Sequence, residues 1–249
     1  HHYVPRWLLR RFCHSGETTN YYSKLTHSKG VHGRNIRSIF GGFHTNSIRH
    51  RNGHINDSLE SGFYQAIDNT GASLVRDALR IIDEGMHPSV RDGESAFIAQ
   101  LLYNQIKRSK DFQSSINLPL ATQALALQGA RAIEKHFFPL SEGERQAIFS
   151  PASLSEDEDF IRVSVLSMQG EEAIAALTAL IPVFLIADGD CKFIASGISV
   201  AICEDDFAQH GRQYIMPIDP RVAISLLGND PDLPSDRVVY LRSESVDDI

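Results

Sequence analysis

The chain has 249 residues, of which 42% are hydrophobic and 22% are charged. This composition excludes disordered, collagen-like and fibrous proteins, and the length fits one large globular domain or two small ones. The net charge of −7 is unevenly spread, because residues 1–54 carry nine Lys and Arg against a single acid, Glu17. This segment also holds eight of the eleven histidines, and its charge is +8, whereas the charge of residues 55–249 is −15.

The cysteine content favours a reducing compartment. Cys13, Cys191 and Cys203 are odd in number, and their spacing fits neither a disulfide framework nor a zinc ribbon. The longest apolar run, residues 181–187, is far shorter than the roughly 20 residues of a membrane span. No secretory signal pattern opens the sequence. We therefore expect a cytoplasmic protein without membrane attachment, and the sequence leaves its oligomeric state open.

Residues 1–56 are expected to form short elements. Pro5 predicts a short helix over residues 6–12, because proline is favoured in a first helical turn. Tyr21-Tyr22 and residues 36–40 are typical of short strands, with Lys29-Gly30 as the turn between them.

Helical periodicity dominates residues 57–181. Asp57 followed by Glu60 has the spacing of a capping box, in which side chains satisfy the unpaired amides of a helix start. The apolar pattern of that helix continues to Gly85. Further helices are predicted over residues 93–108, over 119–136, after a capping box at 141–144, and from a capping box at 155–158 to the residue before Pro182.

Strand patterns return from Pro182. Residues 183–187 and 191–195 flank Asp188-Gly189-Asp190, which is a strong hairpin signal. Further short strands are predicted over residues 198–203, 213–218, 222–227 and 238–241. We therefore predict a single α+β domain over residues 1–249, in which a small mixed, mostly antiparallel sheet from both ends (1–56 and 182–249) encloses a block of about five helices (57–181).

The opening is the most distinctive motif. His1-His2-Tyr3-Val4-Pro5-Arg6, followed by Leu8-Leu9-Arg10-Arg11-Phe12, resembles the start of a bacterial and fungal family called domain of unknown function 4238. The resemblance extends over residues 1–227, through the element Met216-Pro217-Ile218-Asp219-Pro220. It implies a shared fold, a shared site and an inward-facing carboxylate at Glu60, but it supplies no reaction.

The chain departs from the family pattern in one place. A strand of the family usually ends in Ser/Thr-Asp-x-Pro-Val, whereas this chain has Ser196-Gly197-Ile198-Ser199-Val200. Gly197 thus stands where the family has an acid, and Ser199 where it has a proline. If that acid takes part in chemistry or in metal binding, the site of this protein is altered or inactive.

Four residues are the candidate catalytic set, namely His2, Tyr3, Arg6 and Glu60. An imidazole acts as a general acid or base near neutral pH, and an arginine fork holds a phosphate or a carboxylate. Glu60 would orient the imidazole or share a metal with it. The structural alternative is that His2 and Tyr3 hydrogen-bond a buried turn. The candidate substrate-binding residues are Arg10, Arg34, Arg37 and Ser196.

A second group of histidines lies in the basic segment and comprises His14, His27, His32, His44, His50 and His54. Only His50 and His54 have the spacing of one helix face, and Gly53 disfavours a helix there. Since the spacing does not support a metal site, we expect exposed loop histidines, and the need for a divalent metal or another cofactor stays open.

Two further patterns are expected to be structural. Ser199 lacks the Gly-x-Ser-x-Gly frame of a nucleophile elbow, so residues 196–199 are predicted to form a turn. The acid run 156–159 is predicted to be a solvated helix start, where negative charge favours the macrodipole.

Two classes of function stay open, and the sequence does not decide whether the chain is an enzyme. The first is a nuclease-like phosphodiester hydrolase, of the kind found among toxins and antiviral defence effectors, which the opening motif favours. The second is a non-catalytic protein that holds nucleic acid or an acidic protein on its basic amino-terminal face, which the departure at Gly197 favours. In that segment Lys and Arg alternate with aromatic residues that stack on bases, namely Tyr21, Tyr22, Phe40 and Phe43.

Overall fold

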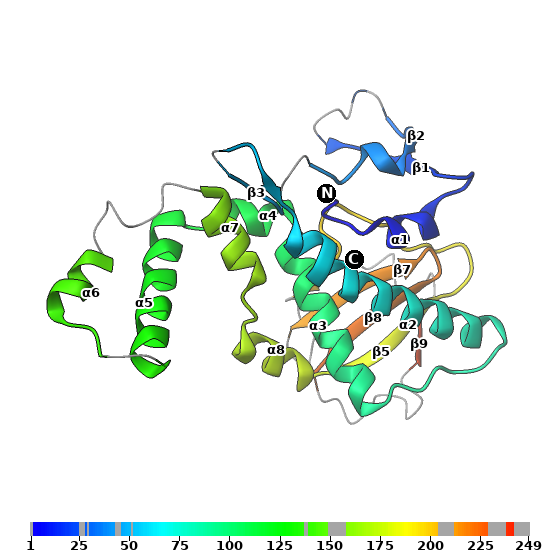
Figure 1. Ribbon diagram of the computed structural model, residues 1–249. Helices are drawn as coiled ribbons and strands as arrows, with labels where there is room; N and C mark the ends of the chain where they lie inside the picture. Colours follow the sequence, from blue (N-terminus) through cyan, green and yellow to red (C-terminus); the bar gives the residue numbers. More distant parts are fainter. Residues whose placement is uncertain are drawn as a thin grey trace.

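The structure is a computed structural model, and it describes residues 2–24, 28, 30–42, 46–50, 52–136, 139–148, 158–203, 212–228 and 238–241 (Figure 1). The amino-terminal elements are α1 (Arg6–Leu9), η1 (Arg10–Phe12), β1 (Thr18–Tyr21), β2 (His32–Asn35), η3 (Ile36–Ser38), β3 (Ile48–Arg49) and β4 (Ile55–Asn56). The helical elements that follow are η4 (Leu59–Tyr64), α2 (Gln65–Asp83), α3 (Asp92–Arg108), α4 (Lys110–Ser115), α5 (Leu118–His136), α6 (Glu142–Ile148), α7 (Glu158–Ser167) and α8 (Glu171–Thr178). The carboxy-terminal strands are β5 (Ile181–Ala187), β6 (Ala201–Cys203), β7 (Gln213–Asp219), β8 (Val222–Leu227) and β9 (Val238–Leu241).

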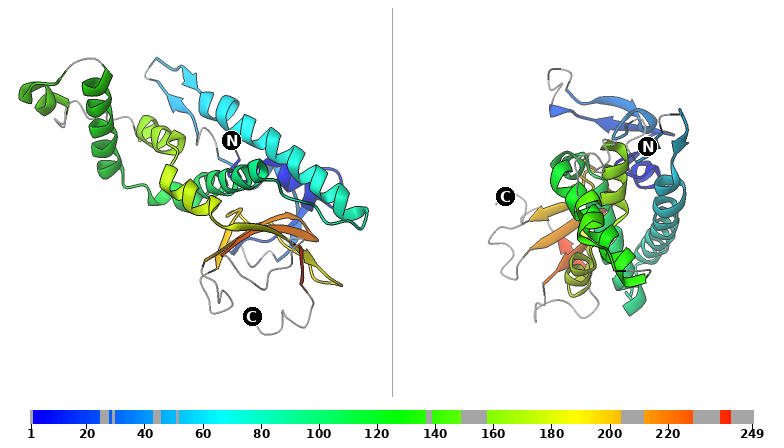
Figure 2. Two further views of the ribbon diagram at one scale, coloured as in Figure 1. Left: turned by 90° about the horizontal axis from the view of Figure 1, so that it is seen from below. Right: turned by 60° about the vertical axis from the view of Figure 1, so that its left-hand side comes forward.

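The five carboxy-terminal strands form one sheet, and helices α2 and α3 lie across it (Figure 2). The strand order is β6-β7-β8-β5-β9, and every neighbouring pair is antiparallel except the parallel pair of β5 and β9. Phe184, Met216 and Ile224 of this sheet share the main hydrophobic core with residues of α2 and α3 such as Val75 and Leu101. The predicted α+β class is confirmed.

The amino-terminal strands do not join this sheet, so that part of the prediction is wrong. Among the described residues, β1 pairs with β2 and β3 pairs with β4, each as a separate antiparallel hairpin. The amino-terminal region joins the main core through apolar side chains of its helical turns instead, including Val4, Leu8 and Ile36. Residues 36–40, predicted as a strand, begin with the 3-10 turn η3, where the Asn35 carboxamide accepts a hydrogen bond from the Arg37 amide.

The hairpin predicted around Asp188-Gly189-Asp190 is also wrong. The chain does turn there, with Gly189 at φ +66°, but residues 191–195 form no strand. Both edges of β5 are already occupied, since Phe184 pairs with Ile224 of β8 on one side and with Val238 of β9 on the other. A strand that follows the turn therefore has no free edge of β5 to pair with.

Most of the predicted helices are confirmed. Helix α2 ends at Asp83, two residues before Gly85, whose φ of +74° fits a glycine beyond a helix end. Helices α3 and α5 lie within one residue of their predicted bounds. The capping box of Ser141 and Glu144 forms, whereas the one at 155–158 falls mostly outside the described residues. Between η4 and β5 the described residues form seven α-helices rather than about five. None of these helices combines the length and the apolar character that crossing a membrane requires.

Helices α5 and α6 lie apart from the sheet, at the left of Figure 1. Helix α5 packs against α7, and α7 in turn packs on β3 and on the turn η4 through a small cluster that includes Leu59, Tyr64 and Leu166. Helix α7 therefore connects this projecting part to the centre of the molecule.

Candidate functional site

A buried arginine, Arg108, lies at the centre of a polar cluster where α3, η4, α2 and the amino-terminal segment meet. The Arg108 side chain is 1% exposed. Its Nη1 donates to both carboxylate oxygens of Asp68, at 2.9 and 3.0 Å. Its Nη2 donates to the backbone oxygen of His2 at 3.2 Å and to Oε1 of Glu60 at 3.4 Å. One guanidinium thus holds the His2 backbone and the Glu60 carboxylate together.

Glu60 faces this cluster because the chain begins its long helix with the π-helical turn η4. Its Oε2 accepts a hydrogen bond from Asn46 Nδ2 at 2.8 Å. The Oδ1 of Asn46 in turn accepts from Gln113 Nε2 at 3.4 Å. The predicted capping role of Glu60 is therefore wrong: the carboxylate pairs with a buried cation instead of a helix amide. π-Helical turns occur frequently at functional sites, because they redirect a side chain within a helix.

Tyr64 and Asp68 complete the cluster from the same face of the helix. The Arg108 Cζ lies 4.6 Å from the centre of the Tyr64 ring, within the range of a cation–π contact. Burial raises the pKa of Tyr64 above its ordinary value. Burial also raises the pKa of Asp68, although the neighbouring Arg108 acts in the opposite direction. The cluster is thus a desolvated site with two carboxylates and one arginine.

His2 lies at the edge of this cluster and is held by the segment of residues 39–41. It forms an isolated antiparallel bridge with Gly41, and its Nδ1 lies 3.2 Å from the backbone oxygen of Ile39. Burial lowers the pKa of His2 below 6.5, whereas the Glu60 carboxylate acts to raise it. The amide of Tyr3 donates to the Phe40 oxygen at 2.7 Å. These contacts also fit the structural alternative, so they do not by themselves assign chemistry to His2.

Three of the four predicted arginines gather around Glu17, the single acid of the basic segment. Arg6 Nη2 lies 3.0 Å and Arg10 Nη2 3.4 Å from Glu17 Oε1, and Arg37 Nε lies 2.6 Å from Oε2. The hydrogen bond from Arg37 is the largest of the effects that lower the pKa of Glu17. We call these four residues the Glu17 cluster. Since three cations share one carboxylate, the cluster carries an excess of positive charge.

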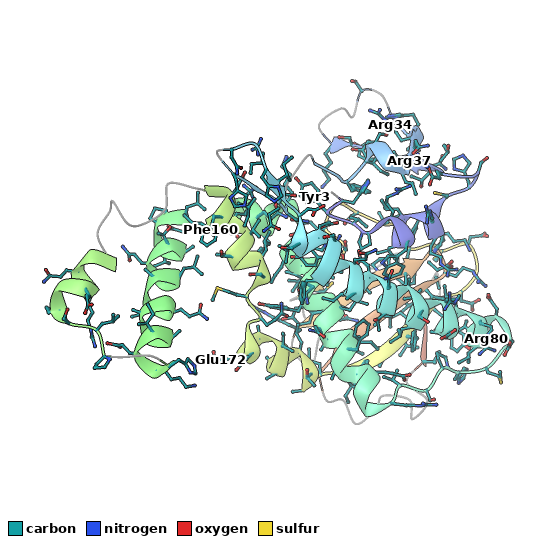
Figure 3. All side chains as sticks on the ribbon, in the orientation of Figure 1. Tyr3, Arg34, Arg37, Arg80, Phe160 and Glu172 are labelled. Carbon is teal, nitrogen blue, oxygen red and sulfur yellow. The ribbon has the colours of Figure 1, made fainter. Side chains whose placement is uncertain are left out.

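Arg34 lies near Arg37 in the region of the β1–β2 hairpin, whereas Tyr3 lies close to the start of α2 (Figure 3). The structure thus separates the predicted set into two neighbouring groups. His2 and Glu60 belong to the Arg108 cluster. Arg6, Arg10 and Arg37 belong to the Glu17 cluster.

Ser196 lies elsewhere, in a turn that lines an apolar pocket. Its Oγ hydrogen-bonds the Ile198 oxygen and accepts from the Ile198 amide at 3.2 Å, which agrees with the predicted turn. Gly197 lies directly against Phe40 in the pocket lining, since a Cβ at position 197 would be 3.4 Å from the Phe40 ring. The departure from the family pattern at Gly197 therefore lies beside the segment that holds His2.

The described histidines of the basic segment lie in loops and hairpins. His50 and His54 stack with ring centres 5.7 Å apart on the β3–β4 hairpin, and His32 Nδ1 lies near the Gly30 oxygen. His14 is exposed, and His27 and His44 fall outside the described residues. Within the part of the chain that the structure describes, no three His, Cys, Asp or Glu side chains come together as a metal site would require.

The acid run 156–159 is described only at its end. Asp159 forms ion pairs with Arg49 and Arg162, and its side chain is only 15% exposed. Burial acts to raise the pKa of Asp159, but the two arginines outweigh it and hold that pKa below its ordinary value. For Asp159 the predicted solvated helix start is therefore wrong, because its carboxylate is largely covered by its partners.

Lys107 adds a second buried cation beside Arg108. Its Nζ donates to the backbone oxygens of Val165, Leu166 and Met168 at 2.8, 2.9 and 2.5 Å, which are acceptors at the end of α7. An ammonium has three protons, so these three oxygens satisfy it fully. Lys107 thus fixes α7 to α3 next to the Arg108 cluster.

Sequence reasoning missed Arg108, Asp68 and Lys107, although a signal was present. Leu101 and Arg108 are seven residues apart, so Arg108 continues the buried stripe of α3, just as Asp68 follows Tyr64 by four residues on the buried face of α2. A charge on an apolar stripe indicates a buried partner of opposite charge, because an isolated buried charge is very unfavourable.

Comparison with known proteins places the chain in a family without assigning it an activity. No curated protein and no solved structure matches it. A family model described as "Protein of unknown function (DUF4238)" matches residues 1–249, which is the whole sequence. The resemblance inferred from the opening motif is thereby confirmed, and the chain belongs to the DUF4238 family.

Proposed function

We propose that this chain is a phosphodiester hydrolase that acts on nucleic acid, with His2 as the proton-transferring group. The observation that carries the proposal is the joint placement of His2 and Glu60 on one buried guanidinium, beside an excess of exposed arginines. Arg108 binds the backbone oxygen of His2 and so fixes this residue beside the Glu60 carboxylate, whose charge acts on the imidazole. A titratable side chain held next to a charge cluster is typical of catalytic sites.

The tautomer of His2 supports this role. A backbone oxygen only accepts hydrogen bonds, so the contact with the Ile39 oxygen requires the proton of a neutral imidazole to be on Nδ1. Nε2 then carries the lone pair. Because burial lowers the pKa of His2 below 6.5, the ring is neutral at pH 7 and is able to take up a proton.

In the proposed hydrolysis, Nε2 of His2 removes a proton from the attacking water as the water oxygen bonds to phosphorus. The bond from phosphorus to the leaving oxygen then breaks, and the imidazolium returns the proton to that oxygen. The Glu60 carboxylate favours the imidazolium, since its charge raises the pKa of His2. Arg6, whose guanidinium is only partly engaged by Glu17, supplies positive charge for the phosphate.

The test compares cleavage of labelled single-stranded RNA and DNA by the wild type and by two variants. His2→Ala should lower turnover by about 10²- to 10⁴-fold, the usual contribution of a general acid or base. Glu60→Gln should reduce turnover less and lower the pH of the acidic limb of the rate profile, because the pKa of His2 falls. His54→Ala is the control, since His54 is an exposed histidine of the same segment. Equal turnover of His2→Ala and wild type would exclude the proposed role of His2.

The second candidate is a non-catalytic protein that binds nucleic acid on the Glu17 cluster. The specific observation is that three arginines share one carboxylate, which leaves positive charge at the surface. Phosphate contacts of this kind weaken steeply as salt rises, because bound counterions are released. Salt-sensitive binding without cleavage of either nucleic acid would favour this candidate over the hydrolase.

We also propose a cytoplasmic location. Cys13, Cys191 and Cys203 are all free thiols in the structure, a state that a reducing compartment maintains. Fractionation of cells that express the tagged full-length protein tests this location.

A further inference from the structure

An aromatic pocket of about 530 Å³ lies between the amino-terminal elements and the segment that follows β5. In Figure 1 that segment, in yellow, passes beside α1. The aromatic residues of its lining come from four separate places in the chain and are Phe12, Tyr21, Tyr22, Phe40 and Phe193. A cavity of this size is ordinary for a small-molecule or nucleotide site.

The aromatic rings are arranged as a partly open box. Tyr21 and Phe40 meet edge to face with ring centres 5.9 Å apart, which fixes both rings. Tyr22 is 53% exposed, so an aromatic face at the pocket is accessible from solvent. Ile194, which also lines the pocket, is 79% exposed. Large solvent-exposed apolar side chains around a concave surface indicate a ligand-binding or interaction site.

Phe40 is held in an unfavourable backbone conformation. Its φ is +50°, which is rare for a residue with a bulky side chain. The hydrogen bond from the Tyr3 amide to the Phe40 oxygen and the bridge between His2 and Gly41 hold it there. Such strain is retained where the surrounding structure imposes it, and it is concentrated at ligand-binding positions.

The pocket and the proposed catalytic residues share the same short segment. The backbone oxygens of Ile39 and Phe40 hold His2 and Tyr3, while the side chains of Ile39 and Phe40 line the pocket. The Glu17 cluster is close to the pocket lining in sequence. Arg10 lies between the lining residues Leu9 and Phe12, and Arg37 precedes Ile39 by two positions.

We propose that this pocket receives one base of a single-stranded nucleic acid, whose neighbouring phosphates lie on the Glu17 cluster. The aromatic walls provide stacking faces, and the arginines provide the charge that a phosphate backbone requires. A base must be unpaired to enter a pocket, so the substrate class is single-stranded. This inference rests on the proposed function for the identity of the ligand, but its test does not depend on cleavage.

The experiment measures the dissociation constant of a fluorescein-labelled uridine hexanucleotide, and of an abasic hexamer of the same charge, by fluorescence anisotropy. The protein carries His2→Ala throughout, so that binding is measured without turnover. The uridine hexamer should bind more tightly than the abasic one, because only the former can stack. Tyr22→Ala should weaken binding of the uridine hexamer by about 5- to 100-fold, the range found for the loss of one base–aromatic stack.

Two matched controls isolate the pocket. Tyr240→Ala removes a tyrosine that is 54% exposed and lies on β9, outside the pocket lining, and it should leave binding unchanged. Gly197→Leu should block the pocket, whereas Gly197→Ala should be tolerated, since its Cβ meets the Phe40 ring at 3.4 Å. Thermal melting confirms that each variant is folded.

Equal binding of the uridine and abasic hexamers, or wild-type binding by both Tyr22→Ala and Gly197→Leu, would overturn the inference. A fluorescent fatty acid provides a further test. If Gly197→Leu abolishes binding of the fatty acid but not of the hexanucleotide, the pocket holds an acyl chain and the inference is also overturned. The proposed hydrolase fails on a different result, namely wild-type cleavage by His2→Ala. The two failures are therefore distinguishable.

Discussion

The Glu17 cluster and the Arg108 cluster are built from the same two side-chain types in opposite proportions. At the surface, three arginines share one carboxylate, and the Arg37 side chain is 67% exposed. In the interior, one arginine that is 1% exposed serves two carboxylates and a backbone oxygen. The first arrangement leaves positive charge for a partner, whereas the second pairs two carboxylates with a single cation inside the fold. We therefore expect changes in the Glu17 cluster to alter binding and changes in the Arg108 cluster to alter stability.

The largest expected effect is the loss of the interior cation. Arg108→Met leaves the partly buried carboxylates of Asp68 and Glu60 without their cation, and should reduce the free energy of unfolding by about 3–5 kcal/mol. Urea denaturation measures this loss. Arg80→Met is the control, because the exposed pair of Arg80 and Glu84 on one helix face contributes only about 0.5 kcal/mol. A loss of less than about 1 kcal/mol for Arg108→Met would show that the two clusters do not differ in kind.

Neutralising the two carboxylates that Arg108→Met leaves without a cation should recover part of that stability. Adding Asp68→Asn and Glu60→Gln to Arg108→Met takes away the uncompensated charges, and at least about 1 kcal/mol should return. The same denaturation experiment measures the recovery. If the triple variant is as unstable as Arg108→Met, the cost lies in lost packing against Tyr64 and not in charge.

Changes in the Glu17 cluster should alter nucleic-acid binding and not the stability of the fold. Glu17→Gln removes the single carboxylate among three arginines, and should tighten binding of a single-stranded oligonucleotide about two- to threefold at low salt. The gain should vanish near 1 M salt, where the screening length is about 3 Å. Anisotropy titrations at two salt concentrations measure this, with Glu84→Gln as the control. Weaker binding by Glu17→Gln would mean that the carboxylate positions the arginines.

The smallest expected effect lies between the two clusters, at His2. Burial lowers the pKa of His2 in the folded state below 6.5, so the unfolded chain binds a proton first as the pH falls. The stability linked to His2 is therefore present above pH 6.5 and is lost as the pH falls towards the folded pKa. Since Glu60 acts to raise that pKa, Glu60→Gln should lower it further. An NMR titration of the imidazole resonances tests both directions, and a pKa above 6.5 would contradict them.

The sequence predicted elements whose signals are local. Gly85 follows the end of α2 and the apolar stripe of α3 is continuous, so both helices follow from periodicity and a single turn residue. The hairpin at Gly189 failed because strand pairing depends on which edges remain free, and β9, which occupies one edge of β5, lies about fifty residues further along the chain.

In the candidate site, too, residues with a local sequence signal were predicted and contacts between distant segments were not. His2 and Glu60 were found from a motif and a resemblance, and the structure brings both to Arg108. Arg6, Arg10 and Arg37 were expected to bind substrate, but their shared use of Glu17 depends on the three-dimensional fold. Arg108 itself belongs to no motif, since its role arises only when elements far apart in sequence meet around it.

The final turn of α3 has a consequence for the order of folding. Its last two residues are cations that bind distant segments of the chain. Arg108 binds His2, which is 106 residues before it, and Lys107 binds Leu166, which is 59 residues after it. Arg108 needs the amino-terminal segment and Lys107 needs α7, so both cations are satisfied only when both distant segments have arrived. This turn should therefore be completed late in folding, and detachment of either the amino-terminal segment or α7 should increase the exchange of its amide protons with solvent.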